Sequence, residues 1–249
     1  LPPRAPVRAW EKWLTATVLA ILVLCCLLPL AAVWLKAATA GSSWAVLLEA
    51  QTWAAVWNTI RFSAAAVAAA TVLGVLYAAA ARQMAWLRAL MFLPFMVSPV
   101  CIAFGVLLLY PQWTASLWLL TATYALLAYP FVAKDVLAAW DGLPKDYAAA
   151  ARTMGANGFQ TACYVTAPLL KPALRRGLTL ASATCIGEFA ATLFLSRPEW
   201  QTLTTLIYDY LGRAGADNYG RAMVLTAVLT ALALAAFLLV DEAEGQKAV

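Results

Sequence analysis

The chain contains no histidine, and this absence excludes several kinds of active site at once. Ser/His and Cys/His catalytic arrangements, HExxH metal sites and histidine general bases all require an imidazole. The five cysteines, Cys25, Cys26, Cys101, Cys163 and Cys185, occur in no CxxC spacing, and all but Cys163 lie in apolar runs. We therefore interpret the cysteines as packing residues, and we expect neither a disulfide nor a metal site.

Charged residues are also scarce. Only 12% of the 249 residues are charged and 64% are hydrophobic, whereas an ordinary soluble domain has about 25% charged residues. This composition indicates an integral membrane protein in contact with lipid. The 17 Lys and Arg residues outnumber the 12 Asp and Glu residues, but cytoplasmic loops of membrane proteins collect basic residues, so the net charge of +5 does not imply a nucleic-acid partner.

The first residues, LPPRAPVRAW, lack a methionine and lack the apolar region and small-residue cleavage site of a signal peptide. Two interpretations stay open. The chain is either trimmed at its start or the second half of a longer, fused polypeptide.

Six stretches reach or approach the roughly 20 apolar residues that cross a bilayer. The predicted spans are Leu14–Trp34, Phe62–Ala81, Ala89–Tyr110, Trp113–Ala133, Gly177–Ser196 and Ala222–Val240. The sequence therefore predicts one all-α transmembrane domain over residues 1–249. Pro94 and Pro99 predict a kink or a break in the third span, and the short YPQW segment predicts a tight turn before the fourth.

The distribution of basic residues predicts the orientation of the spans. With the N-terminus inside, the cytoplasmic segments hold twelve Lys and Arg residues and the outer segments hold five: Lys36, Arg61, Arg197, Arg213 and Arg221. This bias favours both termini in the cytoplasm. The loop at 141–172 is then cytoplasmic. The loop at 197–221 is then outside, and its TLTTLIYDYL segment predicts a short amphipathic helix at the outer surface.

The polar stretch DYAAAARTMGANGFQTACYVTAPL, residues 146–169, interrupts this apolar chain. Pro144 suits the first position of a helix, Asp146 suits the first turn, and Arg152 suits the last turn. Gly155 follows as a left-handed cap, so we expect a helix over Pro144–Met154. Leu143, Tyr147, Ala150 and Met154 share one stripe of this helix, and Ala148 to Ala151 leave another face nearly flat.

A second helix is predicted after the glycine turn. Asn157 can cap it, with Gln160 completing a capping box, and Pro168 is expected to stop it. Physical reasoning alone leaves two interpretations of these two helices and their turn open: an interfacial hairpin that covers the end of the bundle, or a docking element for a cytoplasmic partner.

The same stretch resembles the EAA loop of permease subunits in bacterial ABC importers. That pattern is Glu-Ala-Ala, three residues, Gly, nine residues, Ile, one residue and Leu-Pro, and it is matched here in spacing by 149–151, Gly155, Val165 and 167–168. The resemblance implies that the loop supplies a coupling helix that docks on an ATPase subunit. The residues so implicated are Asp146, Tyr147, Ala149, Ala150, Ala151, Arg152, Gly155, Ala156, Val165 and Pro168.

Two positions depart from the family pattern. Ala149 stands where the family has glutamate, and Ala167 stands where it has leucine. In the family the acidic residue contributes to the contact with the ATPase, so its replacement implies weaker docking of this permease half.

Other segments extend the resemblance over most of the chain. Residues 58–82 are similar to the first core helix of the permease domain, residues 93–110 to its proline-interrupted helix, and IGEFAATLFL at 186–195 to the GEFGAT segment of permeases for oxyanions, ferric iron and thiamine. The resemblance implies six transmembrane helices in the bacterial inner membrane, with a coupling helix between the fourth and fifth. It also implies an ATPase dimer that holds ATP and Mg²⁺, a second permease half and an extracytoplasmic binding protein. The chain itself has no GxxxxGK[ST] phosphate loop, so we expect no cofactor in it and no enzymatic activity of its own.

Glu188 is the one ionisable residue within the predicted spans, where a charge is costly unless it is paired, hydrated or protonated. It is either a permeation-pathway residue or a structural carboxylate. Pro99, Ser98 and Thr192 are further pathway candidates. Two other functions stay open: a secondary transporter in which Glu188 carries protons, and a membrane scaffold or sensor that transports nothing.

Overall fold

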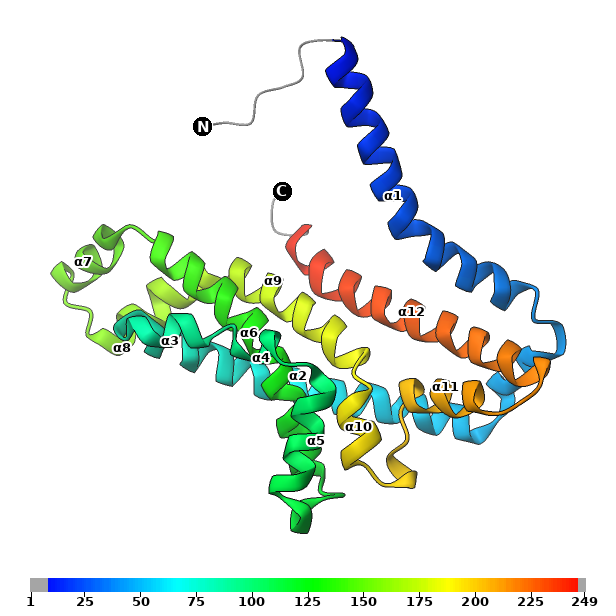
Figure 1. Cartoon of the computed structure of the whole chain (residues 1–249). Helices are drawn as coiled ribbons and strands as arrows, with labels where there is room; N and C mark the ends of the chain where they lie inside the picture. Colours follow the sequence, from blue (N-terminus) through cyan, green and yellow to red (C-terminus); the bar gives the residue numbers. More distant parts are fainter. Residues whose placement is uncertain (1–8, 246–249) are drawn as a thin grey trace.

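The computed structural model describes residues 9–245, which form helices joined by short turns, with no strand among them (Figure 1). The five longest helices are α1 (Ala9–Ala38), α2 (Ala50–Gln83), α6 (Leu117–Gly142), α9 (Ala167–Ile186) and α12 (Ala216–Gly245). The shorter ones are η1 (Gly41–Leu48), α3 (Ala85–Leu90), α4 (Leu93–Met96), α5 (Pro99–Leu109), η2 (Pro111–Trp113), α7 (Lys145–Thr153), α8 (Gly158–Thr161), a π-helical segment (Ala162–Thr166), α10 (Ala190–Leu195), η4 (Pro198–Trp200) and α11 (Leu203–Gly212). Residues 1–8 and 246–249, with three of the basic residues used to predict orientation, lie outside the described residues.

Helix α6 lies at the centre of the main core, packed between α2 and α9 (Figure 1). Two glycines make this packing close. A Cβ atom on Gly74 would lie 2.7 Å from Val132 Cβ, and one on Gly177 would lie 2.7 Å from Val132 Cα. Small residues at such positions allow helix backbones to approach each other in a membrane. Val132 is fully buried and marks the point where the three helices meet.

A second core joins α11 and α12 to η1 and the adjoining ends of α1 and α2. Polar contacts accompany it. Arg221 pairs with Glu49 at 2.7 Å and with Asp217 at 2.9 Å. Burial raises the pKa of the Tyr210 phenol, which stays protonated and donates to Glu49 Oε2 at 2.9 Å. These contacts fasten the start of α12 to the start of α2, at the end of the bundle away from α7.

Within residues 9–245, four helices are long and apolar enough to cross a bilayer: Lys12–Ala38, Ala50–Gln83, Leu117–Gly142 and Ala216–Val240. The third predicted span is instead divided into two pieces, Ala85–Met96 and Pro99–Leu109, which meet at 96°. The break that Pro94 and Pro99 predict is therefore confirmed. A 3-10 turn, η2, follows α5 before α6, as the short YPQW segment predicts.

The fifth predicted span, Gly177–Ser196, is not one helix, and the sequence interpretation of a continuous span is wrong at this point. Helix α9 ends at Ile186, and α10 begins at Ala190 after a three-residue break. Helix α10 then lies against α5, with the rings of Phe104 and Phe194 5.8 Å apart. The side chain and carbonyl group of Glu188, described below, account for the break.

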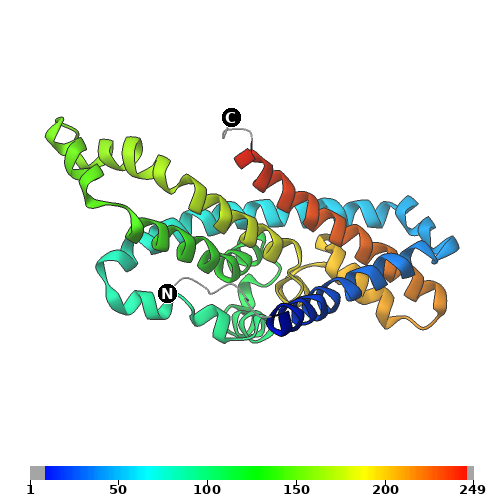
Figure 2. The same cartoon turned by 90° about the horizontal axis from the view of Figure 1, so that it is seen from above.

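Helix α1 stands apart from the rest of the bundle. It meets the other helices near its C-terminal end, where Ala37 is buried and packs in the second core (Figures 1 and 2). Its apolar side chains, including Leu22 and Leu24, are otherwise exposed. In a membrane these side chains face lipid or another protein.

Candidate functional site

Helices α7 and α8 project beyond the ends of α2 and α6, at the opposite end of the molecule from α11 (Figures 1 and 2). The predicted coupling residues all lie here, on α7, the turn after it, the π-helical segment and the first turn of α9. The fold thus gathers them in one projecting unit.

Helix α7 is closed at its C-terminal end as the sequence predicts. Gly155 has a φ of +87°, in the left-handed region. Its N–H donates to the Arg152 carbonyl at 3.0 Å, and the Ala156 N–H donates to the Ala151 carbonyl at 3.0 Å. This pair of bonds is a Schellman motif, which satisfies carbonyl groups that a helix end leaves unpaired. The helix covers Lys145–Thr153, one residue shorter at each end than expected.

The predicted capping box is also confirmed. The Gln160 N–H donates to Asn157 Oδ1 at 2.8 Å, and the Asn157 N–H donates to Gln160 Oε1 at 2.9 Å. Helix α8 begins at this cap.

Pro168 does not stop the second helix, and this prediction is wrong. The chain runs from α8 through the π-helical segment Ala162–Thr166 directly into α9, which also contains Pro172. A proline lacks the N–H for an i to i−4 hydrogen bond, and its ring clashes with the carbonyl four residues earlier. A π-helical segment changes the hydrogen-bond register, so Pro168 follows it in the first turn of α9. The second part of the loop at 141–172 and the first part of the fifth predicted span therefore belong to one helical segment, from Gly158 to Ile186.

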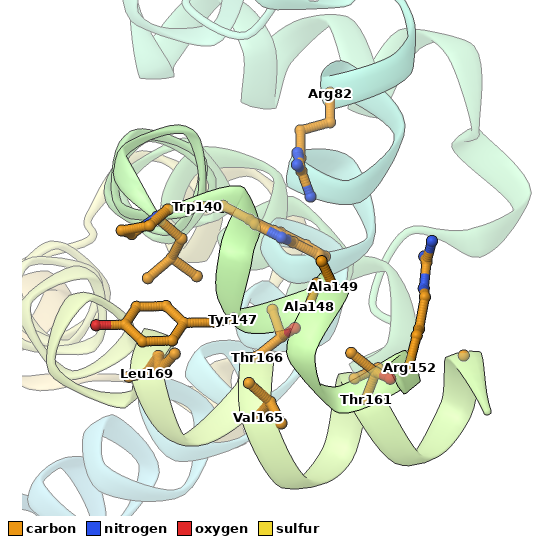
Figure 3. A pocket seen from close by; sticks show the side chains of 14 residues that line it. Arg82, Trp140, Tyr147, Ala148, Ala149, Arg152, Thr161, Val165, Thr166 and Leu169 are labelled. Atoms are coloured by element: carbon orange, nitrogen blue, oxygen red, sulfur yellow. The ribbon is translucent and has the colours of Figure 1, made fainter. Parts of the chain in front are cut away.

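A cavity of about 400 Å³ separates α7 from the end of the bundle (Figure 3). Ala149, at the position of the family glutamate, lines it together with Arg152 and Arg82. The Arg82 guanidinium lies 4.9 Å from the ring centre of Trp140 and 4.0 Å from an Asp141 carboxylate oxygen. No ion pair of Arg152 occurs within the described residues. The cavity therefore combines two cationic side chains with an alanine where an acidic one is expected.

Four large apolar side chains are exposed on this unit. Tyr147 is 53% exposed, Met154 88%, Phe159 78% and Tyr164 80%. The first two belong to the stripe predicted on α7, and the others come from α8 and the π-helical segment. We name these four residues the docking surface. Large exposed apolar side chains on a polar loop are typical of a protein interaction site.

Glu188 lies at the break between α9 and α10 and is 8% exposed. Its Oε1 accepts the Ala191 N–H at 3.1 Å, so the carboxylate caps the first turn of α10. Its carbonyl oxygen accepts hydrogen bonds from the hydroxyls of Thr204 at 2.9 Å and Tyr124 at 3.4 Å. Tyr124 also bonds to Thr192. The Glu188 backbone carbonyl, rather than its carboxylate, therefore holds a buried polar cluster that joins α6, α10 and α11.

The structure separates the remaining pathway candidates. Thr192 belongs to the cluster around Glu188 and is buried, whereas Ser98 and Pro99 are exposed at the break between α4 and α5. Tyr124 and Thr204 were not predicted. Nothing in the sequence around Tyr124 distinguishes it from other aromatic residues in the spans, and its partner lies 64 residues away.

Residues 70–241 match the family of binding-protein-dependent transport system inner membrane components. The chain belongs to this family. The matched range includes α6, the projecting unit, the cluster around Glu188 and most of α12. The chain is therefore a permease of the ABC importer type.

Curated relatives agree with this assignment. The permease is 27% identical over 196 residues to the putative 2-aminoethylphosphonate transport system permease protein PhnV of Salmonella typhimurium, covering 75% of this chain and 73% of that protein. It is 32% identical over 164 residues to the sulfate transport system permease protein CysT of Escherichia coli, covering 59% and 58%. It is 30% identical over 111 residues to the molybdenum transport system permease protein ModB of Haemophilus influenzae, covering 43% and 48%.

Solved structures show the same fold. A chain of the bacterial ABC transporter that imports the acidic polysaccharide alginate matches with a TM-score of 0.73 at 17% identity, over 98% of the permease and 100% of that chain. A second structure, in which the alginate transporter is in complex with an alginate pentasaccharide-bound periplasmic protein, matches with a TM-score of 0.72 at 18% identity, over 95% and 96%. The all-α permease fold expected from the sequence is confirmed.

Proposed function

We propose that the permease couples ATP hydrolysis on a partner ATPase dimer to solute import through the unit from α7 to the start of α9. The docking surface carries this proposal, because four large side chains are exposed on a unit whose backbone is fixed by a Schellman motif and a capping box. A rigid unit loses little conformational entropy when it binds. The ATPase side supplies ATP and Mg²⁺, and the permease supplies the docking surface.

The proposed solute is a small oxyanion or phosphonate. The relatives named for aminoethylphosphonate, sulfate and molybdenum support this class. Of the three solute classes predicted from the GEF-type segment, ferric iron and thiamine find no support among these names. The solute comes from an extracytoplasmic binding protein, which the periplasmic protein in the alginate complex supports by analogy.

The proposed arrangement places the projecting unit and both termini in the cytoplasm, with a second permease half beside this one. The basic residues Lys171, Arg175 and Arg176, near the start of α9, support this orientation. Helix α11 then lies at the outer surface.

Two glycines of the projecting unit offer a matched test of docking. Gly155 and Gly158 both adjoin open space, since no atom lies within 4 Å of a Cβ placed on either, but only Gly155 has a positive φ. Gly155→Ala therefore strains the cap by about 1–2 kcal/mol, whereas Gly158→Ala does not. We expect Gly155→Ala to weaken ATPase binding and uptake several-fold, with membrane insertion unchanged. Co-purification of the ATPase and solute-stimulated ATP hydrolysis measure the effect.

Full ATPase retention and full uptake by Gly155→Ala, or equal losses in both variants, would contradict the docking role. The same experiment addresses the two rival functions. A secondary transporter keeps its uptake when the ATPase is inactivated and loses it with an uncoupler, and a scaffold shows no uptake at all. The capping of α10 by Glu188 favours a structural role for this carboxylate over that of a proton carrier.

A further inference from the structure

A second cavity, of about 440 Å³, lies between α10 and α11, on the part of the molecule that the proposed orientation places outside. Its volume falls in the range of small-molecule sites. One wall includes Thr192, which bonds to Tyr124 beside Glu188, so the cavity reaches the buried polar cluster. The residues that line it are mainly polar: Gln51, Thr192, Leu193, Ser196, Arg197, Pro198, Gln201, Thr205 and Asp209.

Hydrogen bonds fix the polar groups of this cavity. The Gln51 side-chain amide donates to Gln201 Oε1 at 2.8 Å, and the Gln201 amide donates to Asp209 Oδ2. This chain of bonds orients the carboxylate and leaves its other oxygen, Oδ1, without a hydrogen bond among the described residues. Asp209 is thus held in place with an acceptor still available.

One of the side chains that line the cavity, Arg197, is cationic. The Arg197 guanidinium lies 5.2 Å from the ring centre of Trp200, and it makes no ion pair within residues 9–245. Asp209 makes none there either. Two opposite charges therefore line one cavity without neutralising each other. A simple dianion such as sulfate would be attracted by Arg197 but repelled by Asp209, whereas a zwitterion satisfies both.

We propose that the cavity between α10 and α11 is a transient binding site for a small zwitterion on its way from the binding protein. Arg197 receives the oxyanion group and Asp209 receives an ammonium group. This inference rests on the proposed function and narrows its solute class to oxyanions that carry an amine, such as an aminoalkylphosphonate.

The test measures binding to the permease in its complex with the ATPase, in lipid nanodiscs and without the binding protein. Saturation-transfer difference NMR suits the weak affinity of a transient site. The probes are aminoethylphosphonate, which carries both charges, ethylphosphonate, which lacks the ammonium group, and ethylammonium, which lacks the phosphonate. We expect the zwitterion to bind about tenfold more tightly than either single-charge probe, the ratio that corresponds to one modest charge-assisted contact.

Two charge-removing variants assign the roles. Asp209→Asn is expected to abolish the preference over ethylphosphonate, and Arg197→Gln the preference over ethylammonium. Asp209→Glu keeps the charge and is expected to retain most of the preference, which separates this role from a loss of folding. Glu199→Gln is the matched control, because Glu199 lies in the neighbouring turn η4, is exposed and does not line the cavity.

Equal binding of aminoethylphosphonate and ethylphosphonate, an unchanged preference in Asp209→Asn, or no saturable binding of the zwitterion would each overturn the inference. ATP-driven uptake of sulfate or molybdate with unchanged kinetics in Asp209→Asn would also overturn it while leaving the proposed function intact. If the proposed function is wrong, uptake does not depend on the ATPase, and this outcome is measured separately.

Discussion

Replacement of Gly177 by alanine tests the close packing at the centre of the bundle. A Cβ atom at this position would lie 2.7 Å from Val132 Cα, 3.2 Å from the Phe131 carbonyl oxygen and 3.3 Å from Val132 N. Ordinary contact begins at 3.4 Å, so the shortest of these distances falls short by about 0.7 Å. All three atoms belong to the backbone of α6, and no side-chain rotation can relieve the overlap. Helices α6 and α9 must therefore separate.

Overpacking of this kind costs about 1–3 kcal/mol. In a chain of this length each kcal/mol corresponds to roughly 2–4 °C in Tm, so we expect Gly177→Ala to lower Tm by roughly 2–12 °C. Thermal unfolding of the purified permease, followed by size-exclusion chromatography with tryptophan fluorescence, measures the shift.

The same substitution at Gly105 is the control. Gly105 lies within α5, and a Cβ placed on it has no atom within 4 Å. Alanine is a better helix former than glycine by about 0.5–1 kcal/mol, so Gly105→Ala is expected to keep or raise Tm. A Gly177→Ala protein as stable as the Gly105→Ala protein would refute the close approach of α6 and α9.

Two further predictions concern single side chains. Glu188→Leu leaves the Ala191 N–H without its acceptor and should destabilise the permease by about 1–3 kcal/mol. Glu188→Gln keeps an acceptor oxygen and should lose less stability. Equal Tm values for the two variants would argue against the capping role. Ala149→Glu places a carboxylate in the cavity that Arg82 and Arg152 line, and we expect several-fold stronger, salt-sensitive retention of the ATPase. Ala85→Glu is the control, since Ala85 is exposed at the start of α3, does not line that cavity and is not among the predicted coupling residues. An equal gain from both substitutions would show a general charge effect.

Local features were predictable from the sequence because they depend on residues only a few positions apart. The left-handed cap at Gly155, the capping box of Asn157 and Gln160, and the break near Pro99 each follow from backbone stereochemistry and short-range hydrogen bonds. The predicted coupling residues came from the resemblance to the EAA loop, and their grouping in one unit needed no distant contact because they lie within residues 146–168.

Features that depend on distant residues were not predictable in this way. The break at Glu188 involves Thr204 and Tyr124, which lie 16 and 64 residues away. Apolar composition alone predicted a continuous span there, because GEFAATLFL contains no proline to mark an interruption. Pro168 was misinterpreted for the opposite reason, since a π-helical segment lets a helix continue where a proline alone predicts its end.

Under the proposed function, the uninterrupted helical segment from Gly158 to Ile186 acts as a lever arm. At about 1.5 Å per residue it is roughly 43 Å long, so a tilt of about 5° at the docking surface displaces its far end by roughly 4 Å. That far end is the joint at Glu188, where the chain passes from α9 into α10. This joint is linked to the wall of the outer cavity, because the Glu188 carbonyl accepts from Tyr124, which bonds to Thr192. In the proposed orientation, a small rotation imposed at the cytoplasmic end would therefore reach the outer side of the membrane as an ångström-scale change of shape.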